Sequence, residues 1–145
     1  MFNPSRDQVR SFFIEAWHKQ LQGLPMSQME FMATDIIRLH PEYHALLGDA
    51  GTDITELLAR EWTPEQGEAN PFLHLSLHLA IEEQLSIDQP PGIRDIFNSL
   101  QKRHGERHAA LHDILECLGE TIWRSQREHS APDSAAYLDC ARRKL

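Results

Sequence analysis

The fold class depends on residues 70–87, whose sequence is NPFLHLSLHLAIEEQLSI. Taken alone, the alternation of leucine with polar residues in its first half is typical of a half-buried β-strand. Three features favour a helix. The segment opens with Asn70-Pro71, a cap residue followed by proline at the first helical position, its apolar pattern continues into AIEEQL, and it has no β-branched residue before Ile81. We therefore predict one helix over Phe72–Ile87.

Apolar residues recur at helical spacing upstream of this segment as well. A first helix is predicted from a cap at Asp7 to about Gly23. A second opens at Ser27, which forms a capping box with Glu30, and is broken at Pro41 because the residue before proline is pushed out of the α region.

Two short helical segments and a loop are expected between Pro41 and Asn70. The first is a turn through Tyr43 and Leu47, and the second is capped by Asp53 and runs through Leu57 to Trp62. Residues 63–69 have the composition of a polar connecting loop.

Downstream, residues 88–92 stop the Phe72–Ile87 helix. Helical spacing then runs from Ile93 to about Glu128 with a break predicted at Gly105, and Asp133 can cap a last helix. The sequence has no internal repeat or low-complexity tract. We predict an all-α protein, a single-domain helical bundle over residues 1–145 with short accessory helices.

Composition excludes several kinds of partner. The 145 residues carry 14 Lys and Arg against 22 Asp and Glu, a formal charge of −8, and such a surface repels nucleic acids and anionic membranes. We see no secretory signal and no run of about 20 apolar residues, so a cytoplasmic protein is expected. Cys117 and Cys140 lie outside any C-x-x-C motif and are predicted to be free thiols. A homo-oligomer and a protein partner are both compatible with the sequence, and the small-molecule substrate is unknown.

Seven of the nine histidines fall into sets spaced by four residues, which places each set along one stripe of a helix. A helix can supply two ligands to a single ion when histidines stand four residues apart, one on each of two adjacent turns. His18 and His129 have no such partner and are predicted to lie at the surface. The sets are His40 with His44, His74 with His78 and Glu82, and His104 with His108, His112 and Glu116.

His74 and His78 are expected in the protein interior, because their helix has apolar residues on nearly all sides. A buried imidazole needs a polar partner, which a metal ion or a neighbouring carboxylate can supply. Core histidines satisfied without a metal are the alternative. For His104 and His108 a solvated helix face is favoured, whereas for His112 the solvated and ligating interpretations stay even.

We therefore predict one divalent metal ion, either zinc, iron, manganese or nickel, between the Phe72–Ile87 helix and the His108–Glu116 stretch. With an open coordination position, a bound water could be activated with Glu82 or Glu116 as base. His40 and His44 can each complete the site, and His44 is preferred because it continues into an apolar turn. The predicted ligands are His74, His78 and His112, followed by Glu116, Glu82 and His44.

Two other interpretations remain. One is a non-enzymatic interaction or structural module without a metal, and the other is a pH-responsive protein whose nine histidines shift its association with acidity. Phosphate-loop, dinucleotide, serine-hydrolase and zincin motifs do not occur in the sequence, and whether the protein is an enzyme stays open.

Three stretches resemble a proteobacterial domain-of-unknown-function family of about this length. They are residues 70–84 (NPFLHLSLHLAIEEQ), residues 108–118 (HAALHDILECL) and residues 123–127 (WRSQR). The resemblance implies a small cytoplasmic all-α bacterial protein and supplies no activity. More loosely, His44 with the two histidine pairs resembles the three-His metal site of DinB-like bundles and the His-rich site of hemerythrins, which implies a metal-binding helical bundle.

Overall fold

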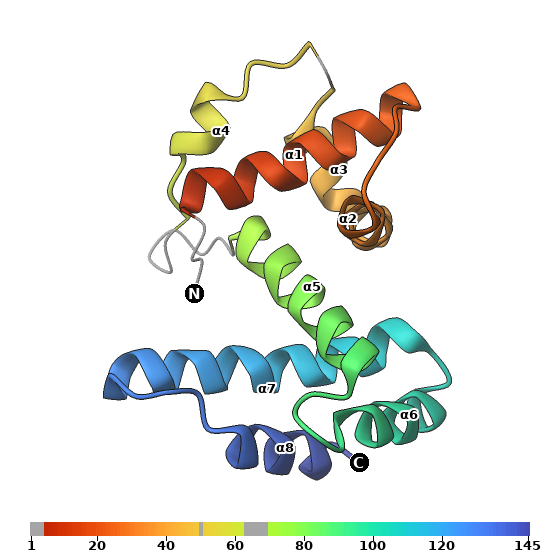
Figure 1. The fold of residues 1–145 in the computed structure, drawn as a ribbon, viewed down its shortest axis with the longest axis vertical. Coiled ribbons are helices and arrows are strands. Elements are labelled where there is room, and N and C mark those ends of the chain that lie inside the picture. The colour runs from red at the N-terminus through yellow and green to blue at the C-terminus, as the bar shows by residue number, and fades with distance from the viewer. Residues whose placement is uncertain (1–4, 50, 63–69) are drawn as a thin grey trace. The chain divides into compact units, whose positions relative to one another are not determined.

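The computed structural model describes residues 5–49, 51–62 and 70–145, which are helical with no strand among them (Figure 1). The predicted all-α class is confirmed. The helices are α1 (Arg6–Gln22), α2 (Gln28–Arg38), η1 (Pro41–Tyr43), α3 (His44–Leu47), α4 (Thr55–Ala59), α5 (Pro71–Ile87), α6 (Ile93–His104), α7 (Arg107–Glu128) and α8 (Ser134–Arg143).

The chain divides into two compact units, residues 1–79 and residues 80–145, with the division inside α5. The expectation of a single domain stays a prediction. No described helix combines the length and the apolar composition that crossing a membrane requires.

In the first unit, local capping decides where α1 and α2 begin and end. The predicted capping box of α2 is confirmed, with Ser27 Oγ accepting from the Glu30 amide and Glu30 Oε1 accepting from the Ser27 amide. The predicted cap of α1 is wrong by two residues. Ser5, not Asp7, caps α1 by the same reciprocal arrangement with Gln8, because Gln8 is the residue three positions on that can reach back.

The predicted short helix at Asp53 is shorter than expected. The Asp53 carboxylate accepts from the Thr55 amide, but α4 has no side-chain cap and ends at Ala59, so Trp62 lies beyond it. The expected loop over residues 63–69 lies outside the described residues.

The core of the first unit forms where α1 packs against α2 and α4 (Figure 1). The N-terminal half of α5 adds Phe72 and Leu75 to the same cluster of buried side chains. Leu75 is completely buried whereas Leu73, which a strand would place on the same face, is 57% exposed, and this difference agrees with the predicted helix. The cluster consists of Phe13, Ile14, Ala16, Trp17, Ala33, Ile36, Ile37, Leu47, Leu57, Phe72 and Leu75.

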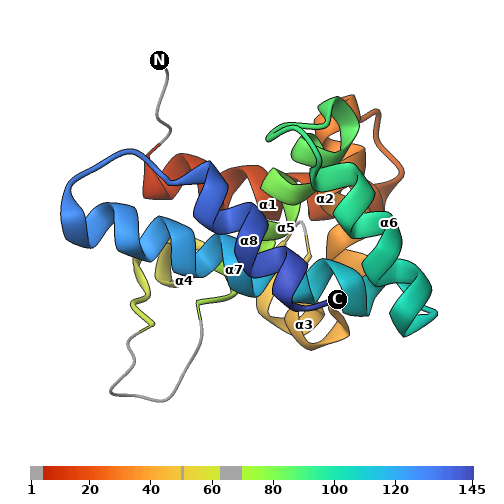
Figure 2. The same cartoon turned by 90° about the horizontal axis from the view of Figure 1, so that it is seen from below.

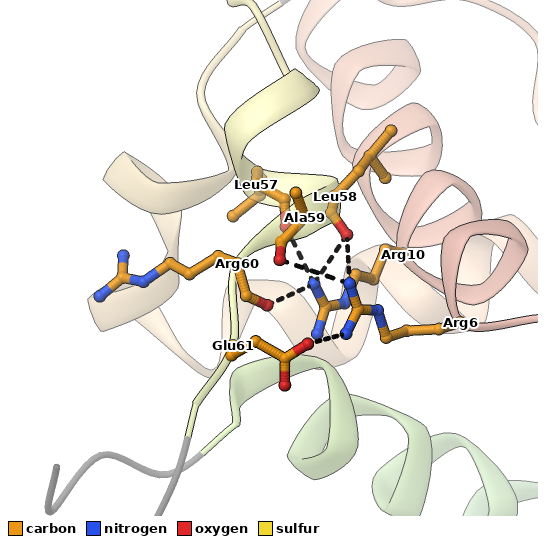
Figure 3. A network of polar contacts seen from close by, with 7 residues as sticks. All are labelled: Arg6, Arg10, Leu57, Leu58, Ala59, Arg60 and Glu61. Carbon is orange, nitrogen blue, oxygen red and sulfur yellow. Dashed lines mark hydrogen bonds and ion pairs between the residues drawn. The ribbon is translucent and has the colours of Figure 1, made fainter.

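Two arginines of α1 bind the C-terminal end of α4 (Figure 3). Arg10 is only 2% exposed, and its Nη1 donates to the carbonyl oxygens of Leu57, Leu58 and Arg60 at 3.1, 3.0 and 2.8 Å. Arg6 Nη2 donates to the carbonyls of Leu58 and Ala59 at 3.2 and 3.4 Å. The last carbonyls of a helix lack intrahelical donors, and a cation there also interacts favourably with the helix dipole. The two guanidinium groups therefore hold a five-residue helix that has little intrinsic stability.

In the second unit, α7 packs against both α6 and α8, and Figure 2 shows α8 running beside α7. The predicted break at Gly105 is confirmed, since Gly105 adopts φ +71° between α6 and α7, a conformation that glycine reaches without strain. The predicted cap of α8 is also confirmed, with Asp133 Oδ1 accepting from the Ala136 amide. Tyr137 of α8 is buried and donates its hydroxyl to Gln84 Oε1 at 2.6 Å.

The expectation of two free thiols is wrong. Cys117 on α7 and Cys140 on α8 form a disulfide, with their Cα atoms 5.7 Å apart. The two residues are 23 positions apart in sequence, so only the antiparallel return of α8 along α7 brings them together. The expectation rested on the absence of a short-range cysteine motif, which carries no information about such a long-range contact.

Candidate metal site

His40 is held in a defined orientation at the end of α2. It precedes Pro41 and leaves the helical conformation, with φ −125° and ψ 68°, and its side chain is 2% exposed. Its Nδ1 lies 2.8 Å from the carbonyl oxygen of Ile36. Because a carbonyl oxygen only accepts, Nδ1 carries the proton and donates it. In the neutral ring Nε2 then keeps its lone pair, which is the form that ligates a metal ion.

His74 and His78 present their Nε2 atoms to the same place from adjacent turns of α5. His78 is 1% exposed and His74 is half-buried, so the predicted interior position is confirmed for His78 and holds in part for His74. The Nε2 atom of His74 lies 3.0 Å from that of His40 and 3.2 Å from that of His78. Ligand nitrogens of His40 and His78 lie within 4.8 Å of each other. Three imidazole nitrogens therefore converge within the first unit.

Tyr43 forms an aromatic wall beside this cluster. Its ring stacks on that of His40 at a centroid distance of 5.5 Å and an interplanar angle of 9°, and it meets His74 edge-on at 6.2 Å. Burial raises the pKa of the Tyr43 hydroxyl above its ordinary value. The wall makes the surroundings of His40 less polar, which strengthens electrostatic interactions with a bound cation.

His44, the preferred partner in the sequence-based hypothesis, is engaged elsewhere. Its Nε2 lies 2.8 Å from the carbonyl oxygen of Ile37 and so donates a proton to it, and its ring packs on Trp17 at 4.6 Å. His44 thus ties α3 to α1 and to the end of α2, and His40 takes the place beside His74. His18, expected at the surface, is half-buried and its Nε2 donates to the Leu47 carbonyl at 2.9 Å.

The second unit holds a histidine pair on α7. The rings of His108 and His112 lie one helical turn apart with a centroid distance of 4.1 Å, and each ring offers a nitrogen within 4.8 Å of the other. Both residues are half-buried, so His108 differs from the solvated position favoured for it. His104 is exposed as expected and pairs with Asp113 at 2.6 Å.

The two predicted carboxylate ligands form ion pairs within the second unit. Glu82 accepts two parallel hydrogen bonds from Arg107, each 2.8 Å long, and this raises the pKa of the arginine. Glu116 is exposed and accepts from Lys144, whose pKa is raised by that hydrogen bond. Both carboxylates are thus already neutralised by a cation. These contacts give no support to Glu82 or Glu116 as the base that activates a bound water.

His44 is preferred to His40 in the sequence-based hypothesis because it continues into an apolar turn. The signal that could have reversed the ranking is Pro41 itself. A proline pushes the preceding residue out of the α conformation, so His40 lies just beyond the end of α2 with a non-helical backbone. The spacing rule used for the other histidines describes one helix at a time and cannot find such a partner.

Comparison with known proteins identifies a family and no activity. No curated protein matches the chain, and no solved structure matches it. A family model described as a domain of unknown function, DUF1841, matches residues 5–143. The match covers nearly all of the 145 residues, and the chain belongs to the DUF1841 family.

Proposed function

We propose that the protein binds a divalent transition-metal ion through histidine, with His40, His74 and His78 as ligands in the first unit. The observation that carries this proposal is the pair of short contacts at His74 Nε2, 3.0 Å to His40 and 3.2 Å to His78. A tetrahedral ion with metal–nitrogen bonds of about 2.0–2.1 Å holds its nitrogens roughly 3.3 Å apart, which is close to both separations.

Hydrogen bonds alone do not account for both contacts. An imidazole Nε2 has one site in the plane of the ring, occupied either by a proton or by a lone pair. His74 Nε2 can therefore form one good hydrogen bond in the ring plane, with His40 or with His78, and a single hydrogen bond accounts for only one of the two short separations. A cation that accepts a lone pair from each of the three nitrogens satisfies all of them at once.

The Ile36 carbonyl supports the same proposal. By accepting the Nδ1 proton of His40, it orients the ring and selects the tautomer with a ligating Nε2, as backbone carbonyls do around metal-bound histidines. Imidazole ligands suit zinc, iron, nickel and copper. His108 and His112 form a second candidate ligand pair, because one helix supplies them at adjacent turns.

The proposal is tested by elemental analysis of protein purified without a histidine tag, loaded with Zn²⁺, Fe²⁺ or Ni²⁺ and dialysed. We expect the parent protein to retain at least one ion per chain. The variant His40→Ala/His78→Ala should retain less metal or none. The matched control, His104→Ala/His129→Ala, also removes two histidines, but from exposed positions, and should retain the ion. Substoichiometric metal in the parent protein, or full retention in His40→Ala/His78→Ala, would refute the proposal and favour the structural module without a metal.

A third variant, His108→Ala/His112→Ala, defines the role of the second pair. Loss of metal relative to the exposed control assigns ligands to α7, and unchanged metal restricts binding to the first unit. Thermal unfolding with and without metal supplies an independent readout, because a ligand present at 100 times its Kd stabilises the native state by about 2.7 kcal/mol.

A further inference from the structure

The disulfide of the second unit joins two sulfurs in unlike surroundings. Cys117 is completely buried in the middle of α7, among the apolar residues that this helix presents to its neighbours. Cys140 is half-buried on α8, and it lines a cavity of about 300 Å³ between α7 and α8. Cys117 is not among the residues that line this cavity. Of the two cysteines, Cys140 is therefore the one that a molecule in the cavity contacts.

The cavity carries charges of both signs at its walls. Two guanidinium groups and four carboxylates, all on exposed residues, line it: Arg124, Arg143, Glu120, Glu128, Asp133 and Asp139. Arg124 pairs with Glu120 at 2.7 Å and Asp133 caps α8, which leaves Arg143 to pair with a carboxylate of a bound molecule and Glu128 to pair with its ammonium group. A small peptide thiol has carboxylates and an ammonium group in addition to its sulfur, and charged groups of both signs favour such a ligand over a purely apolar one. A volume of about 300 Å³ lies at the lower end of the range of small-molecule sites.

We propose that Cys140 is a site of reversible thiol–disulfide exchange with a small peptide thiol. The thiolate of the incoming molecule attacks Cys140 Sγ and forms a mixed disulfide, while the bond between the two cysteines breaks and Cys117 leaves with the electron pair. Cys117 then takes a proton from water. A second thiol attacks the mixed disulfide and releases the Cys140 thiol. In sum, two thiols are oxidised to one small-molecule disulfide, and the protein disulfide is reduced to two thiols.

Burial of Cys117 determines how long the mixed disulfide on Cys140 persists. Once released, the Cys117 sulfur stays buried beside Cys140, where exchange with an outside molecule is hindered and a return attack on the mixed disulfide is intramolecular. In the parent protein the mixed disulfide is therefore short-lived. Removing the Cys117 sulfur prevents the return attack, and the adduct on Cys140 should persist.

The test compares Cys117→Ser with Cys140→Ser in the full chain, each incubated with oxidised glutathione under native conditions and followed by intact-protein mass spectrometry. We expect one glutathione adduct on Cys117→Ser, formed at least about tenfold faster than on Cys140→Ser, whose remaining thiol is buried. In denaturant the two variants should react at the same rate, which shows that burial and not the thiol itself makes the difference. Equal native rates, or a faster reaction of Cys140→Ser, would overturn the proposal.

A second measurement uses the parent protein and does not depend on either variant folding. Reduced glutathione is added to the oxidised chain, the reaction is stopped with acid and an alkylating reagent, and the glutathione-bearing peptide is identified. The proposal requires that the mixed disulfide be found on Cys140. Glutathione on Cys117, or a disulfide that reduced glutathione opens only in denaturant, contradicts it.

Discussion

Replacing Arg10 with methionine tests whether the buried guanidinium stabilises the first unit. Methionine keeps an unbranched side chain of similar length and removes the charge and all the donors. The guanidinium now donates to three carbonyl oxygens at the end of α4 and lies 5.0 Å from the ring centroid of Trp62 and 5.3 Å from that of Phe72 (Figure 3). We expect Arg10→Met to fold and to be less stable.

The expected loss follows from the three acceptors taken separately. The Leu57 carbonyl makes a buried contact and loses its donor, which costs about 1–3 kcal/mol. The Leu58 carbonyl keeps the hydrogen bond from Arg6, and the carbonyl of the exposed Arg60 can bind water instead. The two cation–π contacts add about 0.5–1 kcal/mol each.

Part of this loss is recovered, because burial lowers the pKa of Arg10 and so disfavours its charged form. The net decrease in the free energy of unfolding should be about 2–3 kcal/mol. Arg6→Met is the matched control. Arg6 reaches the same carbonyls but its side chain is 46% exposed, so its loss should not exceed about 1 kcal/mol.

The assay is urea unfolding followed by tryptophan fluorescence, since Trp17 and Trp62 belong to the first unit. A loss below about 1 kcal/mol in Arg10→Met, or one no larger than in Arg6→Met, would refute the assignment of the guanidinium as the main stabiliser of α4.

Three further outcomes are expected. Leu75→Ala should lower the free energy of unfolding by about 2–5 kcal/mol in urea titrations, because Leu75 is fully buried, whereas Leu73→Ala at a 57% exposed position should change it by less than about 0.5 kcal/mol. The hydrogen bond from Lys19 lowers the pKa of Glu30, so this ion pair stabilises the fold above the ordinary carboxyl pKa and ceases to do so as the pH falls. Between about pH 5 and pH 3 the free energy of unfolding of the parent should fall by up to about 1 kcal/mol more than that of Glu30→Gln, and equal decreases would contradict this. Gly105→Ala should lower the melting temperature through a backbone cost of about 1 kcal/mol, since φ is +71° and nothing lies within 4 Å of the added methyl group, and an unchanged melting temperature would argue against it.

The positions of the helices could be predicted because the signals are local. The Ser27–Glu30 capping box, the Gly105 break and the Asp133 cap each act over three or four residues and are confirmed. The error at the start of α1 has the same local character, since Ser5 and Asp7 both can cap and only the reciprocal bond with Gln8 distinguishes them.

The exposure of large apolar side chains was less predictable. Trp123 and Phe31 are aromatic residues at helical spacing, which predicts a place in the core, but they are 56% and 51% exposed. Helical spacing identifies which residues share a face, but the neighbour that covers this face is not encoded in the spacing.

By itself, the sequence determined the all-α class, most helix ends and the placement of His74 and His78 on one stripe, because hydrophobic period and capping act within a few residues. Only the tertiary structure decided that His40 joins this pair, that Cys117 meets Cys140, and that Arg107 and Lys144 neutralise the predicted carboxylate ligands. These partners are distant in the chain. Which of several chemically equivalent groups comes within bonding distance depends on how whole helices pack, and a one-dimensional pattern does not contain that information.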